Sequence, residues 1–284
     1  MVVRRDFRRN VPEKKVSFFS YWSITNLLIV INVILFFLFL IILKINSSSF
    51  DFIAIKPSNV LELKNVWTVV TSMFMHGGFF HIFVNMFSLF FLGSLTERII
   101  GRRRFFWFYL IAGVIGGLFF IFLALTGSSF SRGDFIFGSV DDYAVGASGA
   151  IFGLLGLLAV LLPKKEIYLI IGPIIVLVMQ LILDNIFPSV SGTIDIISTI
   201  LIFVMIFSMF SMNLGLRKLA MPLKLPFWIA PIIAIVPLFI IAFFVKLPIG
   251  NTAHLGGLVA GLVYGAYLRN KYKQKVKILN KMLR

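Results

Sequence analysis

Long apolar segments separated by short polar connections make up most of this chain. Eight such segments can be traced, and none alternates polar and apolar residues as a membrane strand would. Each is close to the roughly 20 residues that cross a bilayer as a helix. We place them at 22–43, 79–96, 105–126, 144–162, 167–187, 193–213, 226–246 and 250–268. The pattern therefore predicts an all-α, polytopic membrane helix bundle of eight spans.

Composition agrees with a membrane protein and narrows its chemistry. The chain is 60% hydrophobic, whereas a soluble domain is usually nearer half apolar. It has no cysteine, which removes disulfides, thiolate metal sites and cysteine nucleophiles. Three histidines in no metal-ligand spacing predict no metal and no cofactor. The first apolar segment is too long for a signal-peptide core and is not followed by a small-residue cleavage site, so we expect it to be a retained helix.

The charged residues predict how the helices are oriented. Of 27 Lys and Arg residues, 22 fall on one side of the predicted spans and five on the other. Because positive residues favour the cytoplasmic side, both termini are expected in the cytoplasm of a multi-pass protein of the cell membrane. Segments 1–21 and 269–284 become basic cytoplasmic tails around a membrane domain at 22–268. The net charge of +16 lies at span ends, so we expect contact with the lipid bilayer and not with nucleic acid.

Polar side chains within the apolar segments are the candidates for chemistry. Asn85 lies about six residues into its span, and Ser148 and His254 each lie about four residues into theirs. These three spans run in the same direction, so the side chains sit at similar depths, roughly 6–9 Å below the outer surface. His81 shares a helix face with Asn85, four residues away. The sequence predicts that these side chains converge in one plane.

Glycines follow Ser148 and His254 at helical spacing. Gly149 and Gly153 come after the serine, and Gly257 and Gly261 come after the histidine. Small residues at such spacing let two membrane helices approach closely. Two facing stripes would bring the hydroxyl and imidazole to hydrogen-bond distance, as activation of a nucleophile requires. Ordinary helix packing is the alternative interpretation of the stripes, and it is compatible with the catalytic one.

Each polar residue has a functional and a structural interpretation. A lone intramembrane serine is usually a packing residue, whereas an ionisable side chain such as His254 is costly in a bilayer and indicates function. His81 and Asn85 could form an interhelical clasp. They could also donate to a developing negative oxygen together with the Ser148 backbone N–H. His76, at the end of the external loop, is expected to tie that loop down.

Taken together these residues resemble the rhomboid family of intramembrane serine proteases. The resemblance implies a six-helix core, a Ser148–His254 dyad without an acidic third member, and cleavage of transmembrane segments of other proteins. It also implies that Phe152 packs beside the catalytic histidine and that Gly146 belongs to the serine motif. The matching pieces are Trp67, His81-Ile-Phe-Val-Asn85, Glu97-Arg98 with Gly101, Gly146-Ala-Ser148-Gly149, and Ala253-His254-Leu-Gly-Gly257 with Gly261.

The chain departs from the family pattern in two places. Thr68 follows Trp67 where many members have arginine, so the external loop is expected to be held differently. Eight spans also exceed the family's six, and an inserted helical pair would preserve the orientation of everything after it. We favour 167–213 as the insertion, with 226–246 preceding His254. The alternative makes 167–187 the family's fifth helix and the next two spans the insertion.

Three functions remain open from the sequence. The first is a serine endopeptidase that cuts transmembrane substrates near the outer membrane face. The second is an inactive relative that binds membrane clients, which an intact Ser148 and His254 disfavour. The third is a small transporter, which is disfavoured because we see neither a deep charged pathway nor inverted repeats.

Overall fold

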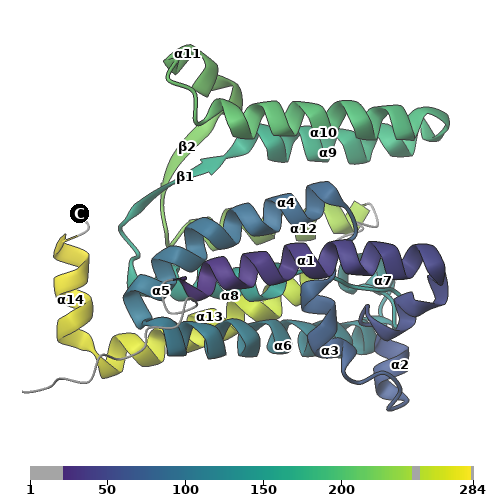
Figure 1. Cartoon of the computed structure of the whole chain (residues 1–284), viewed down its shortest axis with the longest axis horizontal. Helices are drawn as coiled ribbons and strands as arrows, with labels where there is room; N and C mark the ends of the chain where they lie inside the picture. The colour runs from purple at the N-terminus through teal and green to yellow at the C-terminus, as the bar shows by residue number, and fades with distance from the viewer. Residues whose placement is uncertain (1–21, 245–249, 283–284) are drawn as a thin grey trace, which may run out of the picture.

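The computed structural model describes residues 22–244 and 250–282, which are predominantly helical (Figure 1). The basic segment 1–21 lies outside the described residues. The longer helices are α1 (Ile24–Ile45), α4 (Phe79–Ser88), α6 (Arg102–Gly127), α8 (Ser148–Leu161), α9 (Ile171–Ile186), α10 (Ser191–Ser208), α12 (Ala230–Phe244), α13 (Asn251–Lys271) and α14 (Lys273–Met282). The shorter helices and the strands are α2 (Pro57–Leu61), α3 (Thr68–Thr71), α5 (Ser94–Ile100), α7 (Gly133–Phe137), α11 (Leu214–Arg217), β1 (Glu166–Ile170) and β2 (Pro222–Pro226).

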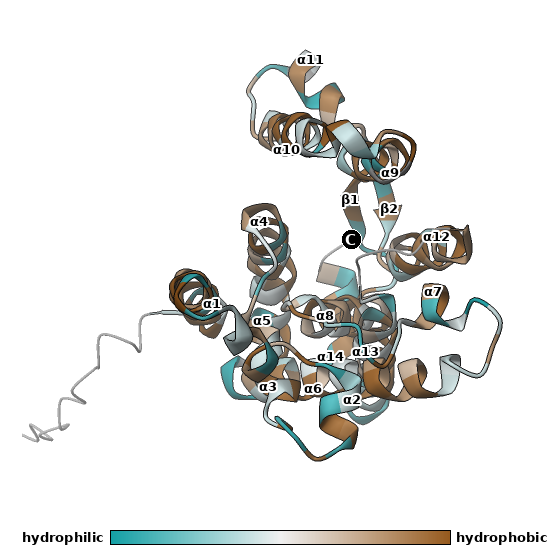
Figure 2. Ribbon diagram, turned by 90° about the vertical axis from the view of Figure 1, so that its right-hand side faces the viewer, coloured by the Kyte–Doolittle hydropathy of each residue, from teal (hydrophilic) through white to brown (hydrophobic). Residues whose placement is uncertain are grey.

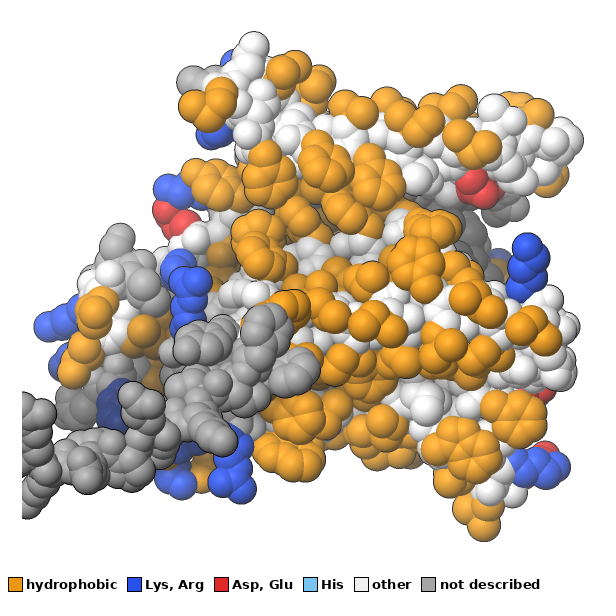
Figure 3. Space-filling view, in the orientation of Figure 1, with side chains coloured by type: hydrophobic (Ala, Val, Ile, Leu, Met, Phe, Trp, Pro, Cys, Tyr) orange, Lys and Arg blue, Asp and Glu red, His pale blue; other side chains and the backbone are white. Residues whose placement is uncertain are grey.

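Length and composition make several of these helices able to cross a membrane. Among the described residues, four helical stretches are long and apolar enough: Ile24–Ile45, Phe79–Ile100, Arg102–Gly127 and Pro188–Ser208. A π-helical turn at Leu89–Gly93 joins α4 to α5 within the second stretch. Hydrophobic side chains form a broad band across the bundle (Figure 3). The fold is thus a polytopic helical bundle, while the number of spans stays a prediction.

The two ends of the bundle differ in character. We call the end that carries Arg102–Arg104, Lys164, Lys165 and α14 the basic end, and the end formed by loops 46–78 and 128–147 the loop end. Helices α6, α8 and α13 connect the two ends through the middle of the molecule (Figure 1). Most of α8 is buried, because α6 and α13 pack along it and α4 and α12 flank it (Figure 2).

Helix α8 starts at Ser148, four residues later than the predicted span 144–162. The segment before it enters the protein as extended backbone, which is tolerated at membrane depth only where its polar groups find partners inside the protein. Ile55 and Ala144 exchange both backbone hydrogen bonds, and the Gly146 N–H donates to the Ser72 carbonyl at 2.8 Å. Loop 46–78 therefore supplies hydrogen-bond partners for the backbone that leads into α8, a helix of 14 residues.

In loop 46–78, several side chains donate hydrogen bonds to backbone carbonyls, in addition to the loop's backbone–backbone bonds. The Trp67 indole donates to Phe52 O at 3.0 Å, and the Thr71 hydroxyl donates to Ile53 O at 2.9 Å. At the position after the tryptophan, Thr68 is fully buried, and its hydroxyl donates to Asn65 O at 2.6 Å. A hydrogen bond from Lys56 holds the pKa of Asp141 below its ordinary value and ties the loop to segment 128–147.

At the basic end a buried carboxylate anchors α1. Glu97 on α5 accepts the backbone N–H groups of Ile24 and Thr25 at 2.8 and 2.9 Å and the Thr25 hydroxyl at 2.7 Å. The first N–H groups of a helix have no intrahelical acceptor, and a negative charge there also suits the helix dipole. Glu97, which belongs to the Glu97-Arg98 motif, therefore fixes α1 to the bundle.

Helices α9 and α10 pack on each other and lie outside the bundle (Figures 1 and 2). Strands β1 and β2 form an antiparallel ribbon that joins this hairpin to the bundle, in a register that pairs Glu166 with Pro226. The ribbon was not predicted, because most of β1 was counted into the apolar span 167–187 and most of β2 was left in the connection before the span 226–246. Phe203 of α10 reaches α4, where its ring lies 4.6 Å from that of Phe83. Helix α12 instead packs against α7, α8 and α13.

Candidate active site

A serine and a histidine meet between the two central helices. Ser148 is the first residue of α8, and His254 is the fourth residue of α13. The distance from His254 Nε2 to Ser148 Oγ is 2.7 Å, which is hydrogen-bond distance. His254 is buried and Ser148 is partly exposed. The structure thus brings together two residues that are 106 positions apart in the chain.

The imidazole of His254 is fixed by an aromatic neighbour. Phe152 lies one turn after Ser148, and its ring stacks on the His254 ring at 4.3 Å with an interplanar angle of 10°. His254 Nδ1 is buried and meets no hydrogen-bond acceptor among the described residues. Stacking, and not a carboxylate, therefore orients this histidine in the described part of the chain.

Glycines set the close approach of α8 and α13. A Cβ added to Gly257 would overlap the carbonyl oxygen of Gly149, and one added to Gly261 would overlap that of Gly153. The two stripes face each other as the sequence spacing suggested. Their contact begins one residue after Ser148 and three residues after His254. The backbones are therefore close where the hydroxyl and the imidazole must meet.

His81 lies beside the turn that leads into Ser148. Gly146 has φ +122°, and a Cβ on it would be 2.8 Å from His81 Nε2. The Gly77 N–H donates to His81 Nδ1 at 3.3 Å, so in the neutral ring the proton resides on Nε2. His81 consequently presents an N–H donor next to the backbone that carries the Ser148 hydroxyl. This is the side of the site on which a negative oxygen could be stabilised.

The sequence predicts that the Asn85 side chain faces Ser148, but in the structure it bonds within its own helix. Its side chain is buried, and its Nδ2 donates to the His81 carbonyl at 2.9 Å, within the same helix. A side-chain donor can back-bond in this way to the carbonyl four residues earlier. One of its two amide N–H donors is therefore used inside α4, and the structure gives no contact between Asn85 and Ser148.

His76 has a role that the sequence analysis described only as fixing a loop. It is buried, its ring packs edge-on against His81 at 5.2 Å, and its Nε2 accepts the Ala147 N–H at 3.4 Å. With Gly146 N–H bonded to Ser72, both amides just before Ser148 are occupied. The Ser148 N–H, at the start of α8, has no intrahelical acceptor and is left as a donor. No sequence signal indicated this contact, because it joins a loop histidine to a backbone amide 71 positions away.

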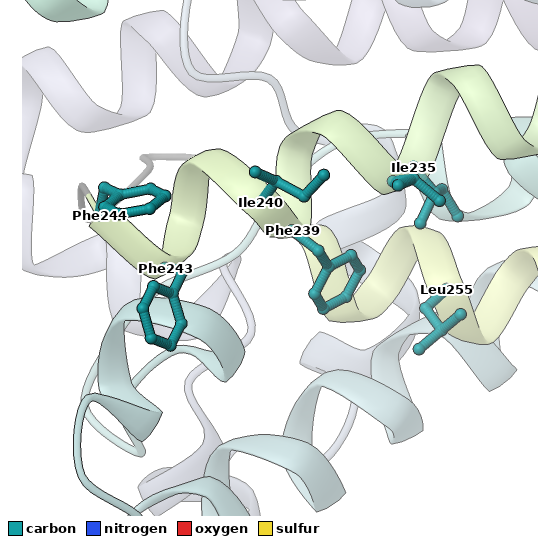
Figure 4. A pocket seen from close by; sticks show the side chains of 7 residues that line it. Ile235, Phe239, Ile240, Phe243, Phe244 and Leu255 are labelled. Atoms are coloured by element: carbon teal, nitrogen blue, oxygen red, sulfur yellow. The ribbon is translucent and has the colours of Figure 1, made fainter.

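A hollow of about 550 Å³ along α12 lacks such chemistry. It is lined by apolar side chains from that helix and by Leu255, but not by Ser148 or His254 (Figure 4). The part of the chain that the structure describes contains no group of three or more His, Asp or Glu residues that could hold a metal ion. The Ser148–His254 pair is therefore the site whose geometry can carry a reaction.

Comparison with known proteins identifies the family. A family model described as "Rhomboid domain" matches residues 63–205, which is half of the chain. This chain belongs to the rhomboid family. The matched region includes His81, Asn85 and Ser148 and ends before His254. For this rhomboid, the pairing of His254 with Ser148 therefore comes from the structure.

Several relatives carry rhomboid names. RHOMBOID-like protein 1 of Arabidopsis thaliana is 38% identical over 40% of this chain and 26% of its own length. Putative rhomboid protease YdcA of Bacillus subtilis is 34% identical over 32% of this chain and 38% of its own length. Rhomboid protease GluP of the same organism is 30% identical over 52% of this chain and 26% of its own length. The chain thus aligns with about a quarter to two fifths of each relative.

Proposed function

We propose that this rhomboid is a serine endopeptidase that cleaves transmembrane segments of other membrane proteins. The observation that carries the proposal is the 2.7 Å contact between His254 Nε2 and Ser148 Oγ. A hydroxyl is a weak nucleophile until a base accepts its proton, and this geometry provides the base. Relatives named as rhomboid proteases support the same activity.

The reaction follows from the two side chains. Neutral His254 takes the Ser148 proton at Nε2 while Oγ attacks the scissile carbonyl carbon, and the carbonyl oxygen becomes negative. The C–N bond then breaks, the leaving amine takes the proton from His254, and an acyl-serine remains. Water attacks that ester with His254 again as base, which releases the acid and restores the hydroxyl.

The negative oxygen needs donors on one side of the attacked carbon. The Ser148 N–H and the His81 Nε2–H are donors close to the Gly146 turn, and Asn85 donates to the His81 carbonyl. We assign Ser148, His81 and Asn85 to the oxyanion site. Asn85 contributes by its hydrogen bond to the carbonyl of His81 on the same helix. Loss of one such donor typically costs about 3–4 kcal/mol of transition-state stabilisation.

Charge supports an orientation for the whole protein. Arg102–Arg104, Lys164 and Lys165 lie at the basic end, whereas Ser148 starts its helix near the loop end. By the positive-inside rule the basic end faces the cytoplasm, with both termini there, in a cell membrane. The dyad would then open toward the outer face, where a substrate helix must expose its backbone to be cut.

We also propose that residues 167–213 are an insertion into a six-helix core. Helices α9 and α10 pack mainly on each other, and Pro222–Pro226 pairs back onto Glu166–Ile170. Helix α12 contacts both α8 and α13, as expected of the core helix that precedes His254. The family match extends to residue 205 and so runs across most of this hairpin, which leaves the insertion to be tested by deletion.

A non-catalytic client-binding role is the second candidate. It has one observation in its favour: a relative named inactive RHOMBOID-like protein 8 of Arabidopsis thaliana is 34% identical over 28% of this chain. The Ser148–His254 contact opposes it, because a protein that only binds clients does not need a hydroxyl aligned with a base.

Purified protein in detergent micelles, incubated with a model transmembrane substrate, tests the proposal. We expect cleavage by the unaltered chain and none above background for Ser148→Ala or His254→Ala. Ser129→Ala, in an exposed turn, is the matched control and should cleave normally. Cleavage that persists in both dyad variants would rule out the protease assignment. A folded chain that binds the substrate and never cuts it would favour the client-binding role.

A further inference from the structure

A groove outside the dyad runs between α6 and α13 from the basic end toward the middle of the bundle. Its volume is about 1160 Å³. Trp107, Ile111 and Ile115 of α6 form one wall, and Val259 and Val263 of α13 form the other. Trp107 is 54% exposed and Val263 65% exposed, so the groove opens sideways onto the apolar surface. A membrane molecule could enter it without crossing the protein.

The mouth of this groove is strongly positive. Arg102, Arg103 and Arg104 line it where α6 begins, with Tyr264 and Tyr267 opposite on α13. The Arg104 guanidinium donates to the Tyr272 hydroxyl at 3.1 Å, and Arg102 is held by Glu97 and Trp22. Arg103 is exposed and pairs with no carboxylate among the described residues. The nearby carboxylate, Glu97, is occupied by the start of α1.

The dimensions match one leaflet of a bilayer. Ile115 lies 11 residues beyond Arg104, about 16 Å along α6 at 1.5 Å per residue. Half of the hydrocarbon core is about 15 Å thick. The groove therefore extends from a charged interface to the bilayer midplane, with a tryptophan near the interface, where amphipathic rings are favoured.

We propose that this groove binds an anionic phospholipid of the inner leaflet. The acyl chain would lie between α6 and α13, and the phosphate would sit against Arg103 and Arg104. A zwitterionic lipid fits the apolar walls equally well but gains less from the basic mouth, because each nearby Lys or Arg contributes about 1 kcal/mol to anionic lipid binding. The inference concerns binding alone: the choice of the inner leaflet rests on the proposed orientation, and nothing in it depends on proteolysis.

Occupancy of the groove also bears on the helix that carries His254. One residue beyond Ile115, Gly116 packs against α13, where a Cβ on it would lie 2.8 Å from Ala253 O. A lipid that fills the seam just below this contact adds packing between α6 and α13. It should therefore stabilise the folded protein by mass action, in proportion to its occupancy.

Fluorescence of Trp107 in lipid nanodiscs of defined composition tests the proposal directly. Dibrominated phosphatidylglycerol and dibrominated phosphatidylcholine quench a tryptophan that they touch, and the Trp107→Phe variant isolates the signal of this residue. We expect phosphatidylglycerol to quench Trp107 at lower mole fraction than phosphatidylcholine. Arg103→Gln should reduce this preference about fivefold, the equivalent of one lost charge contact.

Lys218→Gln is the matched control, because it removes one positive charge from the turn after α11, which is not part of the groove. It should leave the preference unchanged. The thermal midpoint of the unaltered chain should rise with phosphatidylglycerol more than that of Arg103→Gln. Equal quenching of Trp107 by both lipids would overturn the proposal, as would a preference that survives Arg103→Gln or falls equally with Lys218→Gln.

Discussion

Gly146 shows at the scale of one residue why the serine motif needs glycine before Ala147. Its φ of +122° is a conformation that side chains rarely adopt, and His81 Nε2 occupies the space that a Cβ would fill. Backbone strain of this kind costs about 1–3 kcal/mol. The position therefore combines a conformational requirement with a steric one.

Gly146→Ala should consequently lower cleavage far more than it lowers stability. Pushing His81 or the Ser148 amide out of place should remove an oxyanion donor, which typically costs about 100- to 1,000-fold in rate. Initial rates on a transmembrane substrate and thermal midpoints of the same preparations measure both effects. Gly192→Ala, where an added Cβ meets nothing within 4 Å, is the control. A Gly146→Ala enzyme as active as that control would contradict the assigned geometry.

The candidate residues themselves could be predicted, but their detailed contacts could not. Ser148 and His254 stand out because polar side chains are costly in apolar helices, and the glycine stripes because regularly spaced small residues mark helix contacts. Predicting the contact of His76 with Ala147 requires the path of loop 46–78, because it joins residues whose spacing along the chain carries no periodic signal. The bond from Asn85 to the His81 carbonyl lies within one helix, but an i, i+4 pair does not show whether the amide bonds to its own helix or to a neighbouring one.

At the scale of elements, the site depends on how closely α8 and α13 pack. Gly257→Val should force them apart, because the new side chain would overlap the Gly149 carbonyl. A displacement of about 1 Å at a reacting pair can cost roughly 100-fold in rate, and overpacking typically costs about 1–3 kcal/mol of stability. Leu262→Val, which places the same side chain elsewhere on α13, is the control. Full activity in Gly257→Val would show that this contact does not set the dyad.

The helical hairpin gives a second test at this scale. Because Glu166 and Pro226 are ribbon partners, residues 167–225 can be replaced by a two-residue Asn-Gly turn, which suits an antiparallel pair. If 167–213 is an insertion, the shortened chain should still fold and cleave with the same dependence on Ser148. Size-exclusion profiles and cleavage assays of the shortened chain measure this. A shortened chain that folds but never cleaves would assign the hairpin to the catalytic unit.

Element boundaries show where a hydropathy pattern reaches its limit. The spans at 22–43 and 105–126 correspond closely to α1 and α6, since an uninterrupted apolar run in lipid is helical. Apolar residues in β1 were assigned to a helix because the same side chains suit either structure, whereas most of β2 was left in a connection. The alternation in Pro-Leu-Lys-Leu-Pro suits a strand, but five residues are too short for that pattern to stand out beside long apolar runs.

For the whole molecule, the arrangement explains how a polar site exists inside an apolar protein. Helix α8 is short and buried, and its start lies below a loop that satisfies the preceding backbone groups. Charge asymmetry along the chain predicts the orientation of such a bundle, and apolar length predicts its class. Neither predicts that α9 and α10 lie to one side, because lipid accepts apolar helices wherever they are placed.

Covalent labelling of the purified chain by a fluorophosphonate tests the central claim most directly. The probe reacts with a serine hydroxyl whose proton a neighbouring base accepts, so it reports on the Ser148–His254 pair without needing a substrate. Peptide mass spectrometry should find the adduct on Ser148 of the unaltered chain and none on His254→Ala. An adduct on another serine, or equal labelling of Ser148 when His254 is replaced, would contradict the account.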